Sequence, residues 1–243
     1  MIKGLYTSAS GMIPRLKKQD ITANNIANAG TSGFKKDNMF VKELTRAEEK
    51  IVSEKSDWQT PIADEEYVDY RPGVFDRTGN PLDLAIEGDG FFTLEAEDGS
   101  TLLTRSGTFM VDSEGFISYP GGYRLVSEGG PIQVGSGTVN ISENGNVEVD
   151  GLNAGRIVPV SVADLNQLEK VGRSMFAVAE GAELLSSDNT VIQQGYLETS
   201  NVDIVSEMVE MIISYRAYEA NAKAIQSQDS SLDNLFNRVA GSR

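Results

Sequence analysis

Residues 201–239 contain neither glycine nor proline, and this long stretch limits what the chain can fold into. Its apolar residues recur at alternating spacings of four and three over about five heptads, a pattern typical of coiled-coil helices. At 1.5 Å per residue the helix is about 57 Å long, longer than a compact domain needs. A partner helix is expected to cover this stripe; the alternative is a helix lying on its own domain's core. Ser200 and Asn201 are expected to cap its start. The stripe consists of Ile204, Met208, Met211, Tyr215, Tyr218, Ala222, Ile225, Leu232, Phe236 and Val239, with Asp229 as an interruption.

The N-terminal segment carries the same alternation and supplies a candidate partner. Two terminal helices that meet across a long insertion form an antiparallel pair. Pro14 lies inside this segment and removes one helical hydrogen bond. The segment is therefore either a kinked helix or a short piece followed by a main helix that starts near Pro14. We favour the kink, because the alternation keeps its phase through Leu16. The N-terminal stripe consists of Ile2, Leu5, Ala9, Met12, Leu16, Gln19, Ala23 and Ile26.

The composition excludes several classes of function. The 243 residues include no cysteine and no histidine, which removes disulfides, thiolate chemistry, imidazole bases and the usual zinc and haem sites. A hydrophobic fraction of 40% is ordinary for a folded protein. The formal net charge of −15 argues against a nucleic-acid partner. We therefore expect neither a cofactor nor a metal.

The charge is uneven along the chain. Residues 1–50 carry nine Lys and Arg against five Asp and Glu, whereas residues 202–243 carry four against six. These opposite signs favour association of the two ends, although salt screens the effect. No run of about twenty apolar residues is present, so we expect no membrane span. The N-terminus lacks a continuous apolar region, so we expect no cleaved signal peptide.

The sequence pattern in the middle of the chain is typical of an antiparallel β domain. Short alternating runs are separated by turns such as Asp98-Gly99 and Asn144-Gly145, and residues 51–201 hold nineteen of the twenty-four glycines. The predicted fold class is α+β, with paired terminal helices and an inserted antiparallel β domain. The predicted segments are an N-terminal helix in 1–34, an irregular or extended connector in 35–78, the β domain in 79–199 and a C-terminal helix in 200–243. Expected strands include 101–105, 108–111, 116–119, 123–126, 138–142, 146–149 and 157–162.

Paired carboxylates are the only candidates for catalysis. Asp83, Glu87 and Asp89 lie close together near one turn, and acid–base hydrolysis needs two carboxylates at a defined separation. In so acidic a chain such neighbours are more simply solvated turn residues. We therefore expect no enzyme activity and no small-molecule substrate. The rival hypothesis is a secreted β-rich carbohydrate-active enzyme or adhesin with a coiled-coil stalk.

Three groups of residues occur in order at the two ends and in the centre. The N-terminal group is Ser8, Ala9, Ser10, Gly11, Met12, Asn24, Asn25, Ile26, Ala27, Asn28, Thr31, Gly33, Phe34 and Lys35. The central group is Leu82, Asp83, Leu84, Ala85, Ile86, Gly88, Gly90, Phe91, Phe92, Thr104, Arg105, Ser106, Gly107, Thr108 and Phe109. The C-terminal group is Gly195, Leu197, Glu198, Ser200, Asn201, Val202, Met208, Met211, Ile212, Arg216, Ala217, Tyr218, Glu219 and Asn221. Together they resemble the bacterial flagellar basal-body rod and hook proteins.

The resemblance implies a structural role. In this family the terminal helices pair around the axis of a hollow filament and the β domain faces outward. Subunits are exported unfolded through the flagellar type III apparatus, without a cleaved signal, and polymerise in the periplasm. The expected function is thus a subunit of the torque-transmitting rod, with copies of itself and other rod and hook subunits as partners and the apolar stripes as assembly interface. Pro14 departs from the family pattern.

The resemblance leaves the type of subunit open. Hook proteins usually carry an additional outer domain, and this chain is too short for one. The distal-rod and proximal-rod types both remain.

Overall fold

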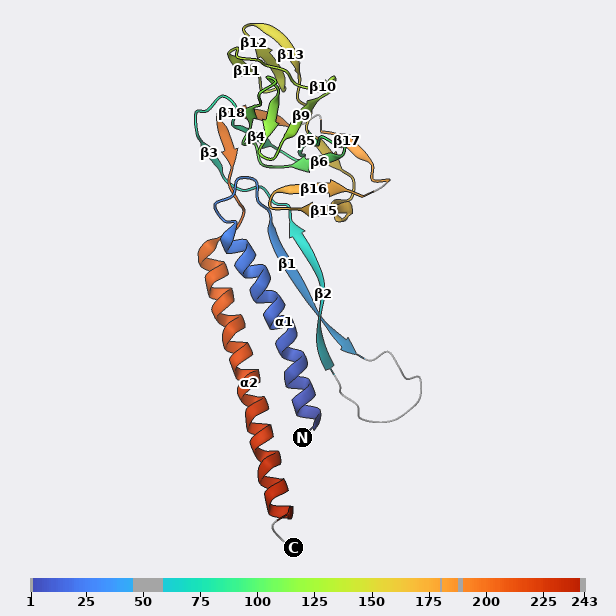
Figure 1. Ribbon diagram of the computed structural model, residues 1–243, viewed down its shortest axis with the longest axis vertical. Coiled ribbons are helices and arrows are strands. Elements are labelled where there is room, and N and C mark those ends of the chain that lie inside the picture. Colours follow the sequence, from blue (N-terminus) through green and yellow to red (C-terminus); the bar gives the residue numbers. More distant parts are fainter. Residues whose placement is uncertain (1, 46–58, 180, 188–189, 241–243) are drawn as a thin grey trace. The chain divides into compact units, whose positions relative to one another are not determined.

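The computed structural model describes residues 2–45, 59–179, 181–187 and 190–240, with side chains for those within 8–40 and 66–237. The chain divides into two compact units. The helical unit draws its described residues from Met1–Ala27, Asp37–Asp69 and Asp203–Arg243, and the β unit from Asn28–Lys36 and Tyr70–Val202. The expected α+β class is confirmed, since the chain has a helix at each end and many antiparallel strands between them (Figure 1).

The first helix, α1 (Ile2–Ala27), is continuous through Pro14. The alternative of two separate helical pieces is therefore wrong. Pro14 itself is buried, so its ring contributes to packing although it donates no backbone hydrogen bond.

The second helix, α2 (Ile204–Ala240), begins after a capping residue that the sequence did not single out. One carboxylate oxygen of Asp203 accepts hydrogen bonds from the backbone nitrogens of Val205 (3.0 Å) and Ser206 (3.4 Å), as expected of an N-cap. The expectation that Ser200 and Asn201 cap the helix is wrong. The hydroxyl of Ser200 accepts from the backbone of Val202, and Asn201 bonds to Lys36 and Arg71 instead.

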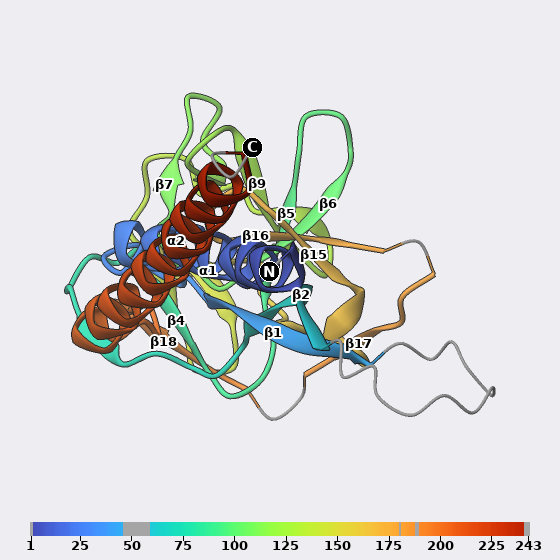
Figure 2. The same ribbon diagram turned by 90° about the horizontal axis from the view of Figure 1, so that it is seen from below.

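The helical unit also contains a two-stranded sheet. Strands β1 (Lys36–Thr45) and β2 (Gln59–Asp69) pair with each other, and β2 contacts α1. Helices α1 and α2 lie side by side (Figures 1 and 2). Residues 35–78, expected to be an irregular or extended connector, contain the paired strands β1 and β2, although residues 46–58 lie outside the described residues. The aromatic rings of Phe40 and Tyr67 stack at 4.4 Å across the two strands.

The β unit contains antiparallel strands grouped in several sheets. The largest sheet has the strand order β15-β16-β6-β5-β9-β8-β7, with β10 paired to β9. A three-stranded sheet has the order β11-β12-β13, and the remaining pairs are β14-β17, β18-β4 and β19-β3. The strands are β3 (Phe75–Arg77), β4 (Leu84–Glu87), β5 (Phe92–Glu95), β6 (Thr101–Thr104), β7 (Met110–Val111), β8 (Ile117–Tyr119), β9 (Tyr123–Ser127), β10 (Gly130–Pro131), β11 (Val139–Ile141), β12 (Asn146–Val149), β13 (Leu152–Arg156), β14 (Val160–Val162), β15 (Leu168–Val171), β16 (Met175–Val178), β17 (Leu184–Ser186), β18 (Val191–Gln194) and β19 (Tyr196–Glu198).

An apolar core joins the largest sheet, the three-stranded sheet and the β18–β4 pair. On β5, Phe92 and Leu94 point to the same side and are buried, as the two-residue period of a strand requires. Leu94 pairs with Leu102 on one side and with Leu125 on the other. Phe92 packs edge-on against Phe109 at 5.3 Å between ring centroids. The two C-terminal strands β18 and β19 pair with β4 and β3, so the end of the β unit packs beside its beginning.

Strand β4 departs from the alternation that its sequence suggested. Leu84 and Ile86 are buried as expected, but the intervening Ala85 is buried as well. Both faces of this short strand are therefore covered, and the polar or small residues of the pattern do not mark a solvent face.

Candidate assembly surface

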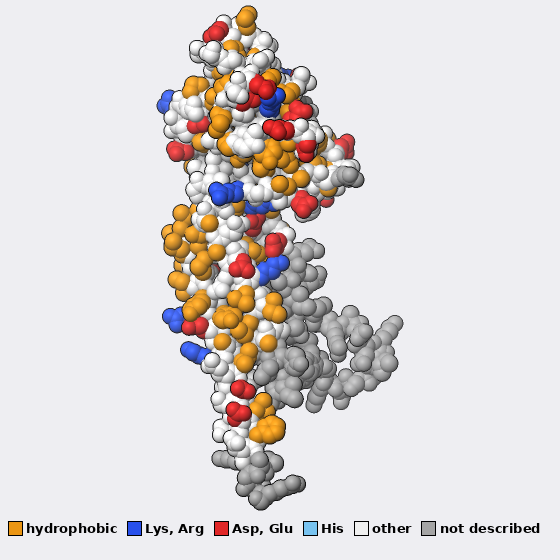
Figure 3. Space-filling view, in the orientation of Figure 1, with side chains coloured by type: hydrophobic (Ala, Val, Ile, Leu, Met, Phe, Trp, Pro, Cys, Tyr) orange, Lys and Arg blue, Asp and Glu red, His pale blue; other side chains and the backbone are white. Residues whose placement is uncertain are grey.

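The most distinctive surface of the helical unit is an exposed apolar face on α2. Its side chains are each 44% or more exposed, an unusual concentration for one side of a single helix. Hydrophobic side chains gather over the upper part of α2 in the space-filling view (Figure 3). We call this the apolar face; it consists of Ile204, Val205, Met208, Val209, Ile212, Ile213 and Tyr215.

The apolar face occupies only the first turns of α2. Apolar residues at i, i+1, i+4 and i+5 give a stripe wider than a heptad seam, because 3.6 residues complete each turn. Further along the same side of the helix the exposed residues are polar, namely Lys223, Gln226, Ser227, Ser230 and Asn234. A partner that buries apolar surface on this side would therefore contact the segment 204–215.

The opposite side of α2 is the one buried within this chain, and it is partly polar. Glu207 and Ser214 are buried, and Asn221 and Gln228 follow at intervals of seven residues with half-buried side chains. Gly11 of α1 approaches Asn221 so closely that a Cβ on Gly11 would lie 3.2 Å from the Asn221 Nδ2. The helices thus meet through small and polar side chains.

A hydrogen-bonded group joins three elements of the helical unit. Asn25 of α1 donates from Nδ2 to Glu207 Oε2 of α2 (3.2 Å) and to the backbone oxygen of Asp37 of β1 (2.9 Å). Its Oδ1 accepts from the backbone nitrogen of Asp37 (3.0 Å). Two neighbouring hydroxyls, Thr22 Oγ1 and Ser214 Oγ, are buried without a hydrogen-bond partner among the described residues. The intramolecular contact between the helices is therefore less apolar than the surface left exposed.

The predicted stripe of α2 coincides with this buried side only in part: Ile225 and Leu232 lie about five turns beyond Glu207 and Ser214 on the same side. None of the members of the two predicted stripes with a described side chain is fully buried. Ile2, Leu5 and Val239 have side chains outside the described residues. The exposed members are Leu16, Ala23, Ile204, Met208, Tyr215 and Phe236. The half-buried members are Ala9, Met12, Gln19, Ile26, Met211, Tyr218, Ala222, Ile225 and Leu232.

Heptad reasoning missed four residues of the apolar face: Val205, Val209, Ile212 and Ile213. The signal was present, because paired apolar residues recur every four positions from 204 to 213. The heptad alternation selects one apolar residue at each spacing of three or four, so it does not include both members of an adjacent apolar pair.

An open groove of about 760 Å³ runs beside the apolar face. Its apolar members are Ala23 of α1 and Met211, Ile212 and Tyr215 of α2. Its polar members are Gln19, Asp20, Arg216 and Glu219. On α1, Ile13 and Leu16 are also exposed. Both helices therefore present apolar side chains to the solvent.

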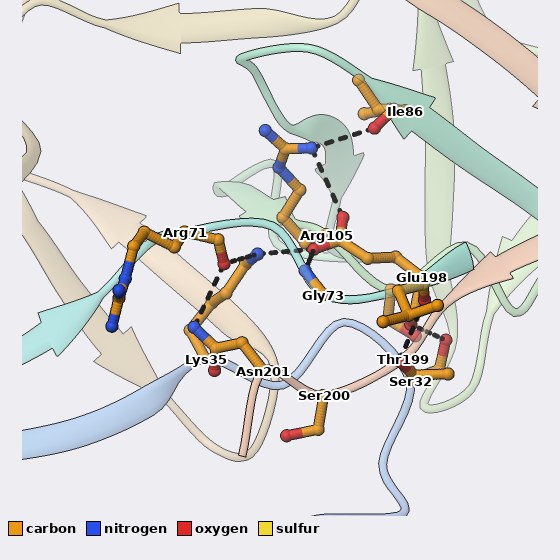
Figure 4. A network of polar contacts seen from close by, with 12 residues as sticks. Ser32, Lys35, Arg71, Gly73, Ile86, Arg105, Glu198, Thr199, Ser200 and Asn201 are labelled. Carbon is orange, nitrogen blue, oxygen red and sulfur yellow. Dashed lines mark hydrogen bonds and ion pairs between the residues drawn. The ribbon is translucent and has the colours of Figure 1, made fainter. Parts of the chain in front are cut away.

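A second notable arrangement lies wholly within the β unit. The carboxylate of Glu198 is completely buried between the ammonium of Lys35, at 2.5 Å from Oε1, and the guanidinium of Arg105, at 3.4 Å from Oε2 (Figure 4). Arg105 also donates to the backbone oxygens of Ile86 (3.2 Å) and Gly88 (2.7 Å). Burial lowers the pKa of Arg105, while the charges of Glu198 and Asp89 act in the opposite direction. One buried carboxylate thus neutralises part of the charge of two buried cations.

The residues of the three sequence groups converge on a few places. Asn24 and Asn25 both bond to Asp37, and Ala27 ends α1. Gly33, Phe34, Lys35, Glu198 and Asn201 surround the buried charges. Asn28 accepts from Thr31, and Val202 donates to Ser200. Several members of the central group lie in or beside β4. Ala85 and Ile86 belong to the strand. Leu82 and Asp83 precede it, and Gly88, Gly90 and Phe91 follow it.

Two of the three candidate catalytic carboxylates, those of Asp83 and Glu87, accept structural hydrogen bonds. Asp83 is buried and accepts from Asn80 Nδ2 (3.0 Å), and Glu87 accepts from Gln193 Nε2 (2.6 Å). The backbone oxygen of Asp89 accepts from Ser187. Among the described residues, no three acidic side chains gather as a metal site, and no helix has the length and hydrophobicity to cross a membrane.

Comparison with known proteins gives matches over the same parts of the chain. Residues 5–35 match the model for "flagella basal body rod protein". Residues 85–149 match "flagellar hook protein FlgE/F/G D1 domain", and residues 193–238 match "flagellar basal body rod FlgEFG protein C-terminal".

Curated relatives align over almost their whole length. The flagellar basal-body rod protein FlgG of Bacillus subtilis is 30% identical over 98% of this chain and 99% of its own. In Caulobacter vibrioides, FlgG is 32% identical over 95% and 97% of the two chains, and FlgF is 32% identical over 93% and 94%. This chain therefore belongs to the flagellar basal-body rod protein family.

Proposed function

We propose that this structural subunit polymerises through its terminal helices into the hollow, torque-transmitting shaft of the flagellar rod. As a member of its family the chain is a component of the flagellum and not an enzyme. The apolar face of α2 carries the proposal, because a soluble monomer rarely leaves such a surface uncovered. The occupant is a second copy of this chain or a related rod subunit, and the rival carbohydrate-active enzyme is set aside.

The magnitude of the interaction is sufficient for assembly. Burying a side chain of this kind is worth about 1.5–3 kcal/mol, so a handful of the seven residues outweighs much of the cost of association. Contacts between different surfaces of successive copies, related by a rotation that does not close, produce an open helix. A shaft assembled in this way has no fixed number of subunits.

The two sides of α2 suit two different neighbours. The polar side, with Glu207 and Ser214, contacts α1 of the same chain. The apolar face and the adjoining groove receive a helix from the next subunit, and Arg216 and Glu219, which pair with each other at 3.8 Å, lie at the margin of this contact. In the assembled shaft, α1 and α2 then form a coiled-coil-like pair within a larger helical array. The predicted stripe residues serve this array as its assembly interface.

The route to the shaft follows from the family. We propose that the chain is exported by the flagellar type III apparatus without a cleaved signal and assembles in the periplasm. In the polymer the terminal helices form the axial layer and the β unit forms a separate domain. In the free subunit the β unit is folded, while the terminal helices, lacking their neighbours, are less protected.

The test is a charge placed in the apolar face. Ile212→Asp introduces a carboxylate at a residue that is 60% exposed in the single chain, so the subunit should fold normally. Assembly should fail, because an unpaired charge would be buried at the contact. Electron microscopy of basal bodies from cells carrying the variant, together with motility, measures the outcome.

The matched control is Ser230→Asp. Ser230 lies on the same side of α2, about five turns further along, where the exposed residues are polar. It introduces the same charge and should leave rods and motility intact. Normal rods in the Ile212→Asp cells would contradict the proposal.

A further inference from the structure

Every passage of the chain between the helical unit and the β unit runs through three short segments of the β unit. After α1 the chain passes through the β unit in residues 28–36 and goes back to the helical unit. It enters the β unit again at 70–73, and it leaves for α2 through 198–202. A load carried along the backbone from one unit to the other must therefore pass through these segments. The hydrogen bonds and ion pairs between these segments therefore determine whether the force reaches the strands of the β unit.

The first and last of these segments are joined directly. The backbone oxygen of Glu198 accepts from the backbone nitrogen of Gly33 (2.8 Å) and from the hydroxyl of Ser32 (3.0 Å). The Oδ1 of Asn201 accepts from the backbone nitrogen of Lys36 (2.8 Å). The Lys35–Glu198 ion pair adds a charge-assisted bond shielded from water.

The middle segment is tied to both of the others. The backbone oxygen of Arg71 accepts from Lys35 Nζ (2.9 Å) and from Asn201 Nδ2 (3.1 Å). The backbone nitrogen of Gly73 donates to Glu198 Oε1 (2.9 Å). The three segments thus converge on the same side chains (Figure 4).

Two glycines allow this convergence. Gly33 has a φ of +66°, and a Cβ there would overlap the backbone of Arg105 and Ser106. A Cβ on Gly73 would overlap the backbone oxygen of Thr199. The close approach of the segments therefore depends on the absence of a side chain at both positions.

We propose that this cluster is a mechanical clamp, which carries force from the terminal helices so that the paired strands of the β unit are not separated one after another. We define the clamp by Ser32, Gly33, Lys35, Lys36, Arg71, Gly73, Arg105, Glu198 and Asn201. Its bonds lie side by side between the segments, so they share a load that separates 28–36 from 198–202. Strand β3 follows Gly73 of the clamp, and strand β19 ends at Glu198 of the clamp; the two strands stay paired until the clamp breaks. The role of the clamp in a torque-bearing shaft rests on the proposed function, but the clamp itself is a property of the single chain.

Single-molecule stretching of the full-length chain tests the clamp. Because the sequence has no cysteine, introduced pairs define the points of attachment. Gly30→Cys with Val202→Cys pulls directly across the clamp. Ser113→Cys with Leu152→Cys stretches a part of the β unit that contains none of the clamp residues. The rate of the first rupture at constant force is measured with both pairs of attachment points.

Two variants weaken the clamp by removing different bonds. Lys35→Met removes the buried ion pair, and Asn201→Ala removes the bonds to Lys36 and Arg71. With the attachments at 30 and 202, each should accelerate the first rupture by about tenfold or more. With the attachments at 113 and 152 the rate should change by less than about twofold. The matched controls Lys223→Met and Asn144→Ala, at exposed positions outside the clamp, should leave both rates unchanged.

The pattern of rates decides the proposal. Equal acceleration through both pairs of attachment points would mean that these residues stabilise the β unit in general and do not bear the load, which overturns the clamp. Unchanged rates across 30 and 202 would also overturn it. Either result leaves the assembly of rods through α2 untouched, because the measurement uses isolated chains.

Discussion

Asn25 in α1 and Glu207 in α2 share a buried hydrogen bond of 3.2 Å, although 182 positions separate them in the sequence. Asn25 also exchanges two bonds with the backbone of Asp37, so one amide side chain links two helices and a strand. This is the structural role of an asparagine in the N-terminal sequence group. The polar contact places both helices in one unit while the apolar face of α2 stays on the outside.

Asn25→Ala should loosen this unit. It leaves the buried carboxylate of Glu207 and the backbone of Asp37 without their shared partner, at a cost of about 1–3 kcal/mol. Hydrogen exchange of the full chain should then show faster exchange in residues 20–27 and 204–210. Asn24→Ala is the control, because Asn24 is exposed and its bond reaches the side chain of Asp37. Equal exchange in Asn25→Ala and the unmodified chain would contradict the assignment.

Periodicity in the sequence predicted both long helices, but it could not tell which neighbour covers which side. The heptad stripe of α2 includes Tyr215, which is exposed here, whereas Glu207 and Ser214 are buried. A search for apolar residues passes over buried polar ones. It also cannot identify the neighbour that covers an exposed apolar residue such as Tyr215, because the pattern contains no information about that neighbour.

The buried charges illustrate a different limit. Lys35 and Glu198 are 163 positions apart, and nothing local in the sequence pairs them. Both belong to the groups of residues that resemble the rod family, but the resemblance does not indicate that the two side chains form an ion pair. The antiparallel β domain was predictable from its turns, but Ala85 on a strand covered on both faces was not, because burial there depends on strands distant in the chain.

Glu198→Gln should destabilise the β unit more than Lys35→Met. The first change removes the carboxylate charge that the buried Lys35 and Arg105 share, and breaking a buried pair in this way typically costs about 3–5 kcal/mol. The second leaves the Arg105–Glu198 pair in place and should cost less. Chemical denaturation of the full chain, followed by near-ultraviolet circular dichroism, compares them. Glu148→Gln, at an exposed site, should change the free energy of unfolding by less than about 0.5 kcal/mol. A larger effect of Lys35→Met would argue against Glu198 as the centre of the network.

Gly33→Ala and Gly30→Ala should differ sharply, although the two glycines are only three positions apart. At Gly33 the φ of +66° and the adjacent backbone of Arg105 leave no room for a methyl group, so alanine should cost more than about 2 kcal/mol. At Gly30 no atom lies within 4 Å of the added carbon, and alanine should be neutral or slightly stabilising. Thermal unfolding of the two variants measures the difference. Similar melting temperatures would show that residues 28–36 do not hold this conformation.

Asp112 should titrate at an unusually low pH. Its carboxylate accepts backbone hydrogen bonds from Phe116 (2.9 Å) and Glu114 (2.8 Å), and these bonds, with the charge of Arg124, lower its pKa. Since the folded pKa is the lower one, this contribution to stability is complete above the pKa of the unfolded chain and is lost as pH falls through the folded value. The window therefore lies below about pH 4. Carbon NMR of the Asp112 carboxyl group follows the titration directly, and Asp112→Asn should flatten the dependence of stability on pH in this window. A titration at the ordinary value for aspartate would mean that the turn at 112–116 is not formed around the carboxylate.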